Sequence, residues 1–129
     1  MFVDTSVMLA MMTDETAARE FSRRMQASSV RLTSPMAVAQ TVIGLTARLG
    51  LPLGEATDAV KTYLQLMNIQ SVAVPPRAAF LAMEARAAFG DAPAGLDLDD
   101  CLTYACARYY RQPLLFSGGG FAATDIEIA

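Results

Sequence analysis

The sequence predicts a three-layer α/β/α sandwich around a small, mainly parallel sheet. Short apolar runs alternate with longer segments in which apolar residues recur every three or four positions, the spacing that a helix requires. Pro and Gly residues separate these segments. Strands that alternate with helices are typical of a parallel sheet covered on both faces. The 129 residues suffice for one hydrophobic core and not for two, so a single domain over 1–129 is expected.

The other observations are organised around the start of the chain. A strand is expected at Phe2 and Val3, Asp4 follows it at once, and Thr5 and Ser6 lead into an apolar helix. In an open parallel sheet, ligands bind outside the carboxyl ends of the strands, so Asp4 is expected where that crevice opens. A carboxylate there caps a helix, is hydrated or binds a cation. The residues of this stretch leave the capping role and the functional role equally open.

The remaining elements follow from caps, breakers and periodicity. A hydroxyl or carboxylate before an apolar run caps a helix, and Gly or Pro ends one. Helices are therefore expected over 7–12, from the cap at Thr13 or Asp14 to about residue 27, from Ser34-Pro35 to Gly50, from Leu51-Pro52 through Met67, from Arg77 to Phe89 and from Leu98 to Tyr110. Strands are expected at 30–33, 69–74 and 114–116, with an edge strand at 124–128 and loops at 91–95 and 117–120.

Composition excludes several classes of chemistry. The chain contains no His, which removes His-based triads, His zinc sites and the usual imidazole base. Its net charge of −3 argues against a nucleic-acid coat protein, but not against an enzyme that handles nucleic acid through metal ions. No apolar stretch is long enough to span a membrane, and no basic segment precedes an apolar one at the N-terminus. A cytoplasmic protein is expected.

The two Cys residues and the eight Met residues indicate where the chain makes apolar contacts. Cys101 and Cys106 lie five positions apart in a helical segment, so their side chains point about 140° apart on the helix. That spacing suits neither a disulfide nor a CxxC metal site, and both residues are expected to be buried in a reducing compartment. Eight Met and a charged fraction of 18% indicate adaptable apolar surface, and hence a partner chain.

A second group of acids lies at the start of the last long helix. Asp97 precedes it, and Asp99 and Asp100 lie in its first turn, where the helix dipole favours negative charge. Asp97 and Asp99 are expected to face solvent, whereas Asp100 shares the apolar neighbourhood of Cys101. Carboxylates that converge in a crevice without Lys or His hold Mg²⁺ or Mn²⁺. Such an ion stabilises a phosphoryl transition state and activates water.

Four motifs, in order along the chain, carry a resemblance to a known family. They are Met1–Ser6, Leu98–Ala105, Pro113–Gly118 and Phe121–Ile126, and Arg48–Pro52 links them. Together they resemble the PIN-domain family, and more narrowly the VapC-type toxins of bacterial toxin–antitoxin pairs. The resemblance runs the length of the chain. It implies a metal-dependent endoribonuclease that cuts RNA and is silenced by a cognate antitoxin.

The resemblance also implies a set of site residues. PIN domains gather about four acids around Mg²⁺ or Mn²⁺, and the motifs place two of them at Asp4 and Asp100, the expected metal ligands. Gln40 stands where the family usually has Glu, and 117–120 reads Ser-Gly-Gly-Gly where the family usually has at least one Asp before Phe121. Asp97, Asp99 and Asp125 are the acids that could stand in. The expected catalytic set is Asp4, Gln40, Asp99 and Asp100.

These departures leave alternative functions open. The chain could be a PIN fold that has lost its metal and binds an antitoxin-like partner. Two acids in the crevice would favour this binding module, and three or four would favour the nuclease. A third reading, a phosphate cradle at Ser117–Gly120, lacks the Lys-Ser/Thr of a P-loop, so a flexible turn is favoured.

Restoring Glu at position 40 and Asp at 119 or 120 is expected to cost little in folding, unless the Gly has a positive φ.

The partner contacts are expected on one apolar surface. Six apolar residues are more than one small core needs, and we expect some of them to form a groove for an antitoxin helix and a homodimer face. These residues are Met11, Met12, Phe21, Met25, Tyr63 and Met67.

Overall fold

The computed structural model describes residues 1–129 and contains the expected parallel sheet. Four strands of two residues each lie in the order β3-β2-β1-β4, and every pair is parallel. The strand β1 is central, because its Phe2 is in register with Leu32 on one side and Leu114 on the other. The strands are β1 (Phe2–Val3), β2 (Leu32–Thr33), β3 (Gln70–Ser71) and β4 (Leu114–Leu115).

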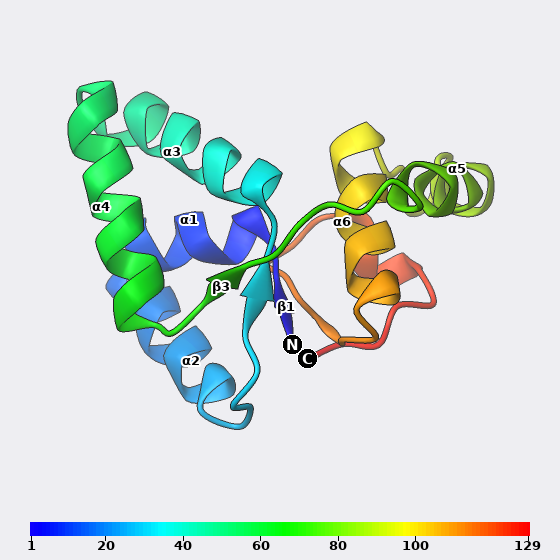
Figure 1. Ribbon diagram of the computed structural model, residues 1–129, viewed down its shortest axis with the longest axis horizontal. Coiled ribbons are helices and arrows are strands. Elements are labelled where there is room, and N and C mark those ends of the chain that lie inside the picture. The colour runs from blue at the N-terminus through cyan, green and yellow to red at the C-terminus, as the bar shows by residue number, and fades with distance from the viewer.

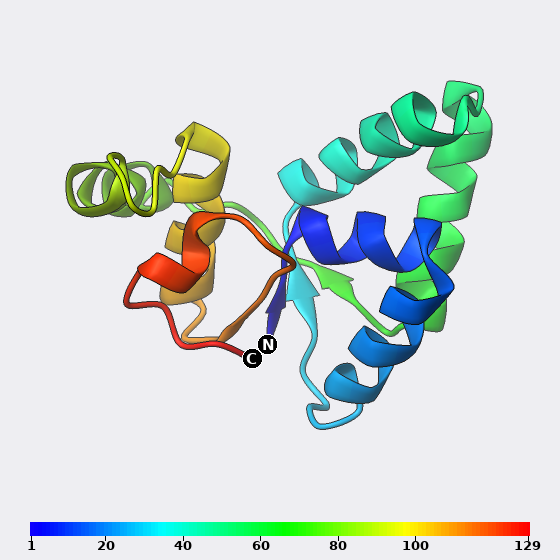
Figure 2. The same cartoon turned by 180° about the vertical axis from the view of Figure 1, so that it is seen from behind.

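Helices cover both faces of the sheet, which confirms the three-layer prediction. Four of them pack on one face and two on the other, and Figures 1 and 2 show β1 between the two groups. The first group is α1 (Thr5–Thr13), α2 (Glu15–Met25), α3 (Pro35–Leu49) and α4 (Leu53–Leu66). The second is α5 (Ala78–Phe89) and α6 (Leu98–Tyr109).

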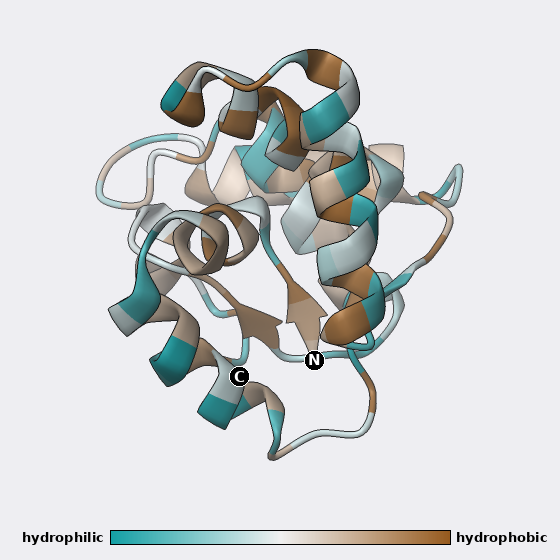
Figure 3. Cartoon of the chain, turned by 90° about the vertical axis from the view of Figure 1, so that its left-hand side faces the viewer, coloured by the Kyte–Doolittle hydropathy of each residue, from teal (hydrophilic) through white to brown (hydrophobic).

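Neighbouring residues of β1 and of the adjacent strand β4 supply the two cores. Successive side chains of a strand point to opposite faces, so two apolar residues in a row serve both layers. Phe2 and Leu114 join the core under α5 and α6, whereas Val3 and Leu115 join the core under α1 and α2. Figure 3 shows these hydrophobic strands at the centre and helices of mixed hydropathy around them. The purely apolar strands therefore indicate a sheet that is buried on both sides.

Short polar residues place the helices where the sequence predicts. The carboxylates of Asp4 and Asp14 cap α1 and α2, and the Ser34 hydroxyl caps α3 ahead of Pro35. Gly50 ends α3 in the left-handed conformation, with φ of 65°. No helix is both long enough and apolar enough to cross a membrane.

The structure differs from the predicted elements mainly in the strands. The strand β1 spans the expected Phe2 and Val3, but β2, β3 and β4 are shorter than expected. The edge strand at 124–128 is absent apart from a single bridge between Leu114 and Ile128. A 3₁₀-helix, η1 (Gly120–Ala123), precedes that segment instead. The backbone of the segment still bonds to β4, since Leu114 donates to the Glu127 carbonyl. The alternation in 124–128 therefore reflects one contact beside β4 rather than a full strand.

Three of the six apolar residues among which partner contacts were expected lie in the core, so the prediction is wrong for those three. Met11, Phe21 and Met25 are buried, and Tyr63 and Met67 pack against the same cluster. Their helical spacing serves the packing of α1, α2 and α4 on the sheet. The expected burial of Cys101 and Cys106 is confirmed. The large exposed apolar side chains are Val30, Ile43, Leu49, Leu53, Leu66, Val74, Phe80, Met83, Leu98, Tyr109 and Ile128.

The start of η1 packs tightly on the loop before α6, and this contact gives a prediction. A Cβ at Gly120 would lie 1.8 Å from the Ala94 carbonyl oxygen, whereas a Cβ at Gly54 in α4 would meet nothing. Gly120→Ala is therefore expected to lower the free energy of unfolding by about 2 kcal/mol or more, because the backbone of the loop must move. Gly54→Ala, the matched control, is expected to raise it by about 0.5–1 kcal/mol. Urea unfolding measures both, and equal stabilities would contradict the close contact.

Candidate functional site

A crevice of about 400 Å³ opens at the carboxyl end of β1, as the sequence predicts for Asp4. It is lined by the first turns of α1 and α6 and by one side of α3. Four carboxylates line it, and Arg48 is the one basic side chain among them. The lining residues are Asp4, Thr5, Ser6, Leu9, Gln40, Arg48, Asp97, Asp99, Asp100 and Thr103.

Asp4 is both a helix cap and a member of the crevice. Its Oδ2 accepts hydrogen bonds from the Ser6 amide at 3.0 Å and from the Ser6 hydroxyl at 2.5 Å. Only 9% of Asp4 is exposed, and this burial raises the pKa of its carboxyl group, although the bonds from Ser6 favour the charged form. The Ser6 hydroxyl also accepts a bond from the Ser117 amide at 3.0 Å. Ser6 therefore joins Asp4 to the loop that follows β4.

Asp97 and Asp100 form a capping box at the start of α6. The Asp100 amide donates to Asp97 Oδ1 at 2.8 Å, and the Asp97 amide donates to Asp100 Oδ2 at 3.3 Å. Burial raises the pKa of Asp100 to about 6, and the negative charges of Asp97 and Asp4 act in the same direction. The influence of Asp4 on this pKa shows that the two expected metal ligands, far apart in the sequence, face the same space.

A hydrogen-bonded chain that the sequence did not reveal crosses the crevice. The Thr5 hydroxyl donates to Gln40 Oε1 at 3.1 Å, and Gln40 Nε2 donates to Asp99 Oδ2 at 2.6 Å. Asp99 and Asp97 are exposed, as expected, yet both line the crevice rather than only facing solvent. The departure at position 40 is thus an amide that binds a carboxylate, which a Glu could not do. Only the three-dimensional pairing of α3 with α6 shows this role.

The loop after β4 contributes no carboxylate, and its backbone explains part of its composition. Gly119 has φ of 75° and ψ of −168°, a conformation that is essentially restricted to Gly. Gly120 has no room for a Cβ. The expectation that Asp at position 120 costs little in folding is therefore wrong, and position 119 is the exception foreseen for a Gly with positive φ.

Asp125 lies outside the crevice, although the sequence left it open as a substitute acid. Its Oδ1 accepts a hydrogen bond from the Tyr104 hydroxyl at 2.5 Å. Burial, together with this bond, raises the pKa of Tyr104 to about 12. The hydrogen bond between Tyr104 and Asp125 therefore connects α6 to the C-terminal segment.

The donor set of the crevice fits a hard divalent cation. Mg²⁺ and Mn²⁺ prefer carboxylate, amide and hydroxyl oxygens, and these atoms line the crevice. Burial first, and neighbouring negative charge second, raise the pKa values of Asp4 and Asp100, and a cation beside them would stabilise their charged forms. As the side chains stand, no three acids are grouped closely enough to ligate one ion together. The carboxylates would therefore turn from their present hydrogen bonds toward the ion, or reach it through water.

Comparison with known proteins identifies the family of the chain. A family model described as the PIN domain matches residues 1–127. The chain belongs to the PIN-domain family. Its relatives include Ribonuclease VapC30 of Mycobacterium tuberculosis, 36% identical over 128 residues that cover 98% of this chain and 95% of the relative. Ribonuclease VapC of Mycolicibacterium smegmatis is 34% identical, with 98% of this chain and 97% of the relative covered. This PIN-domain chain is therefore a member of the VapC ribonuclease group.

Solved structures confirm the PIN fold. A toxin–antitoxin complex from Klebsiella pneumoniae contains a chain that superposes with a TM-score of 0.73 at 15% identity, covering 99% of this chain and 95% of that one. Mycobacterium tuberculosis VapC20, described as a toxin that cleaves the sarcin-ricin loop, superposes with a TM-score of 0.71 at 22% identity and covers 99% and 97%. At these identities the likeness concerns the fold alone.

The raised pKa of Asp100 predicts how pH affects the stability of the metal-free PIN domain. Its ordinary value is 3.8, so the folded state binds this proton more tightly than the unfolded state does. The stability gained is present below about pH 4 and is lost as pH rises through about 6. With EDTA present, Asp100→Asn is therefore expected to remove this loss and to melt at a higher temperature than the parent above about pH 6. Thermal melting between pH 4 and 8 measures this, and Asp58→Asn, an exposed acid of α4, is the control. If the melting temperatures of the parent and of Asp100→Asn change in parallel between pH 4 and 8, the raised pKa of Asp100 is contradicted.

Proposed function

We propose that the protein is a metal-dependent endoribonuclease and the toxin of a VapBC-type toxin–antitoxin pair. The observation that carries the proposal is the crevice, where Asp4 and three acids of α6 gather at the carboxyl edge of a PIN fold. Four acids line the crevice, and three or four favour a nuclease, whereas two would favour a binding module. The ribonuclease names of relatives that match nearly the whole chain support the same activity.

Asp4 and Asp100 are the proposed ligands of Mg²⁺ or Mn²⁺. The ion would supply charge stabilisation for the phosphoryl transition state and acidify a bound water. Both bonds from Ser6 go to Oδ2 of Asp4, so a bound water can link this carboxylate to the ion without breaking them. Asp99 is held at the other wall by Gln40, where its second oxygen can accept a proton or a water. Arg48, exposed at the rim, can bind a phosphate of the RNA strand.

The proposed partners are a cognate VapB-type antitoxin and a second copy of this chain, in the cytoplasm. The Klebsiella pneumoniae structure is a toxin–antitoxin complex, which supports an antitoxin for this chain too. Large apolar side chains remain exposed on three helices, for instance Ile43 on α3, Leu66 on α4 and Phe80 on α5, whose exposed fractions are 59%, 79% and 74%. A partner surface requires a contiguous patch of such side chains, so these residues are the candidates for it.

A second candidate function is a catalytically silent PIN domain that only binds its partner. The amide at Gln40 and the acid-free loop at 117–120 favour it, because the family pattern has carboxylates at both places. This candidate requires that the protein binds an antitoxin and leaves RNA intact in Mg²⁺ and in Mn²⁺.

Purified protein is expected to cleave single-stranded RNA with Mg²⁺ or Mn²⁺ and to lose this activity in EDTA. Asp4→Asn should lower the rate at least about a hundredfold, because a central cation ligand is lost. Asp58→Asn, an exposed acid outside the crevice, is the matched control and should cleave at the parent rate. Gel analysis of labelled RNA measures the rates. If the parent leaves RNA intact in both metals, the protein is the catalytically silent PIN domain instead. If Asp4→Asn cleaves at the parent rate, Asp4 is not a ligand of the ion.

Gln40→Glu tests whether the amide limits the cation site. The Gln40 amide donates to Asp99, so a Glu there would lose this bond and repel Asp99 in the metal-free protein. The metal-free variant is expected to melt at a lower temperature, and its Mn²⁺ affinity is expected to rise about tenfold because one more carboxylate faces the ion. Calorimetric titration measures the affinity, with Gln65→Glu on the exposed side of α4 as the control. Unchanged affinity would show that position 40 does not face the ion.

A further inference from the structure

Three arginines gather at the far end of α6 from the acidic crevice. Arg108 lies in the last turn of α6, Arg111 follows it, and Arg77 precedes α5. The Tyr110 hydroxyl donates to the Ala73 carbonyl at 2.6 Å, which holds the end of α6 beside the segment that leads into α5. We call Arg77, Arg108 and Arg111 the arginine cluster. A helix of 12 residues is about 18 Å long, so the cluster and the crevice are separated by about that distance.

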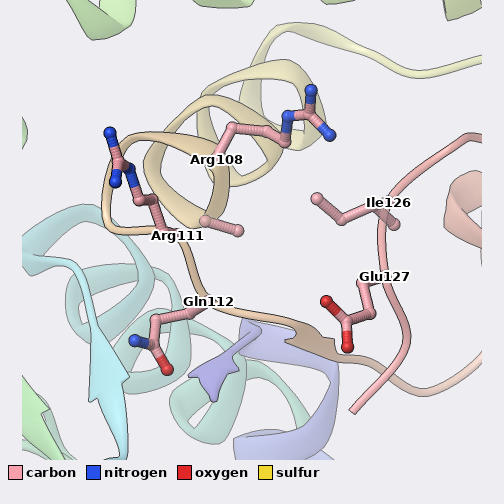
Figure 4. A pocket seen from close by; sticks show the side chains of 6 residues that line it. Arg108, Arg111, Gln112, Ile126 and Glu127 are labelled. Atoms are coloured by element: carbon pink, nitrogen blue, oxygen red, sulfur yellow. The ribbon is translucent and has the colours of Figure 1, made fainter.

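Two hollows flank the arginine cluster. One, of about 390 Å³, is lined by all three arginines with Leu81 and Tyr109, and by no acid. The other, of about 380 Å³, lies between Arg108 and Arg111 on one side and the C-terminal segment on the other. Figure 4 shows the latter, with the Arg108 and Arg111 side chains extending from the end of α6 and Glu127 across the hollow. Arg108 and Arg111 therefore form the ridge between two open hollows.

The guanidinium groups of the cluster are not used by the fold. Elsewhere in the chain, Arg24, Arg31 and Arg86 donate hydrogen bonds to backbone carbonyls, whereas the three arginines of the cluster donate none within the chain. All three are exposed, and Arg108 only lies over the Tyr104 ring at 6.0 Å. Helix capping explains one of them at most: Arg108 complements the dipole of α6, but Arg77 stands at the N-terminus of α5, where positive charge is unfavourable. The cluster therefore presents free phosphate-binding groups.

We propose that the arginine cluster, with Tyr109, binds a single-stranded segment of the RNA substrate outside the crevice. Planar guanidinium groups bind phosphates with two parallel hydrogen bonds, and single-stranded RNA is recognised by such groups beside aromatic rings that stack on its bases. Tyr109 is 42% exposed and lines the acid-free hollow, so it offers that ring. An acidic peptide would use the arginines but not the ring, and RNA is therefore the favoured ligand. The choice of RNA rests on the proposed ribonuclease function.

The charge distribution gives this second binding region a physical reason. The chain carries a net charge of −3, and its crevice gathers four carboxylates, so long RNA is repelled where the crevice is not filled by cations. Three positive charges at one end of α6 would hold a distant part of the strand and raise its local concentration. A substrate too short to reach from the crevice to the cluster gains nothing from it.

RNA binding in EDTA tests this inference without any cleavage. The probe is a fluorescein-labelled single strand of about 16 nucleotides, measured by anisotropy. Arg108→Gln with Arg111→Gln is expected to raise the Kd about tenfold and to reduce the slope of log K against log salt by about 1.4, at about 0.7 for each phosphate that is no longer neutralised. Arg19→Gln with Arg23→Gln removes two exposed arginines of α2 and is the matched control, expected to change the Kd less than about twofold. If both double variants weaken RNA binding equally, the effect comes from the total charge of the protein rather than from the arginine cluster, and the proposal is overturned.

Two further measurements are needed. One distinguishes RNA from an acidic partner, and the other distinguishes failure of this inference from failure of the proposed nuclease function. Tyr109→Ala is expected to weaken RNA binding about threefold or more and to leave binding of poly-glutamate unchanged. Poly-glutamate binding that is tighter than RNA binding, and that is abolished in the Arg108 and Arg111 variant, would assign the cluster to an acidic peptide instead. With Mg²⁺, the double variant should lower kcat/KM for the long strand and not for a trinucleotide. If no RNA is cleaved at all, the proposed function fails while the anisotropy result still decides this inference.

Discussion

A carboxylate buried at the end of the central strand is the constraint on which the rest of the site depends. Asp4 must follow β1 directly, because only there do the first turn of α1 and the Ser6 hydroxyl satisfy its oxygens. Its burial in turn requires the sheet to be covered on both faces, which the paired apolar residues of β1 and β4 achieve. The cost of burying this charge, visible in its raised pKa, is the source of the affinity for a cation that we propose.

Around that carboxylate, the chain uses the same groups for folding and for the site. Asp97 and Asp100 cap α6 and face Asp4, and Ser6 joins Asp4 to the loop after β4. Gln40 is the clearest case, since one amide accepts from Thr5 and donates to Asp99. In the absence of a cation, this amide holds the Asp99 carboxylate in place. A site arranged in this way favours a cation while the metal-free chain still folds.

The fold was largely predictable from the sequence, because caps and periodicity are local. Helices begin after Asp14 and Ser34, and one ends at Gly50, as expected. The alternation of short apolar runs with helical segments predicted a parallel sheet covered on both faces. The site was predictable in its acids at positions 4 and 100, but the link from Gln40 to Asp99 was not, since it depends on how α3 meets α6. Nor could the sequence show that Gly120 touches Ala94, or that the Met residues of α1 and α2 are core. Helical spacing reveals an apolar face without revealing what covers it.

The proposed activity depends above all on a divalent cation in the crevice around Asp4. Titration of Mn²⁺ into the full chain, followed by the loss of the free-ion electron paramagnetic resonance signal, tests this requirement most directly. We predict one bound ion per chain, absent in Asp4→Ala and in Asp100→Ala and kept in Asp125→Asn, since Asp125 lies outside the crevice. Binding that survives both crevice variants, or no binding by the parent chain, would contradict it.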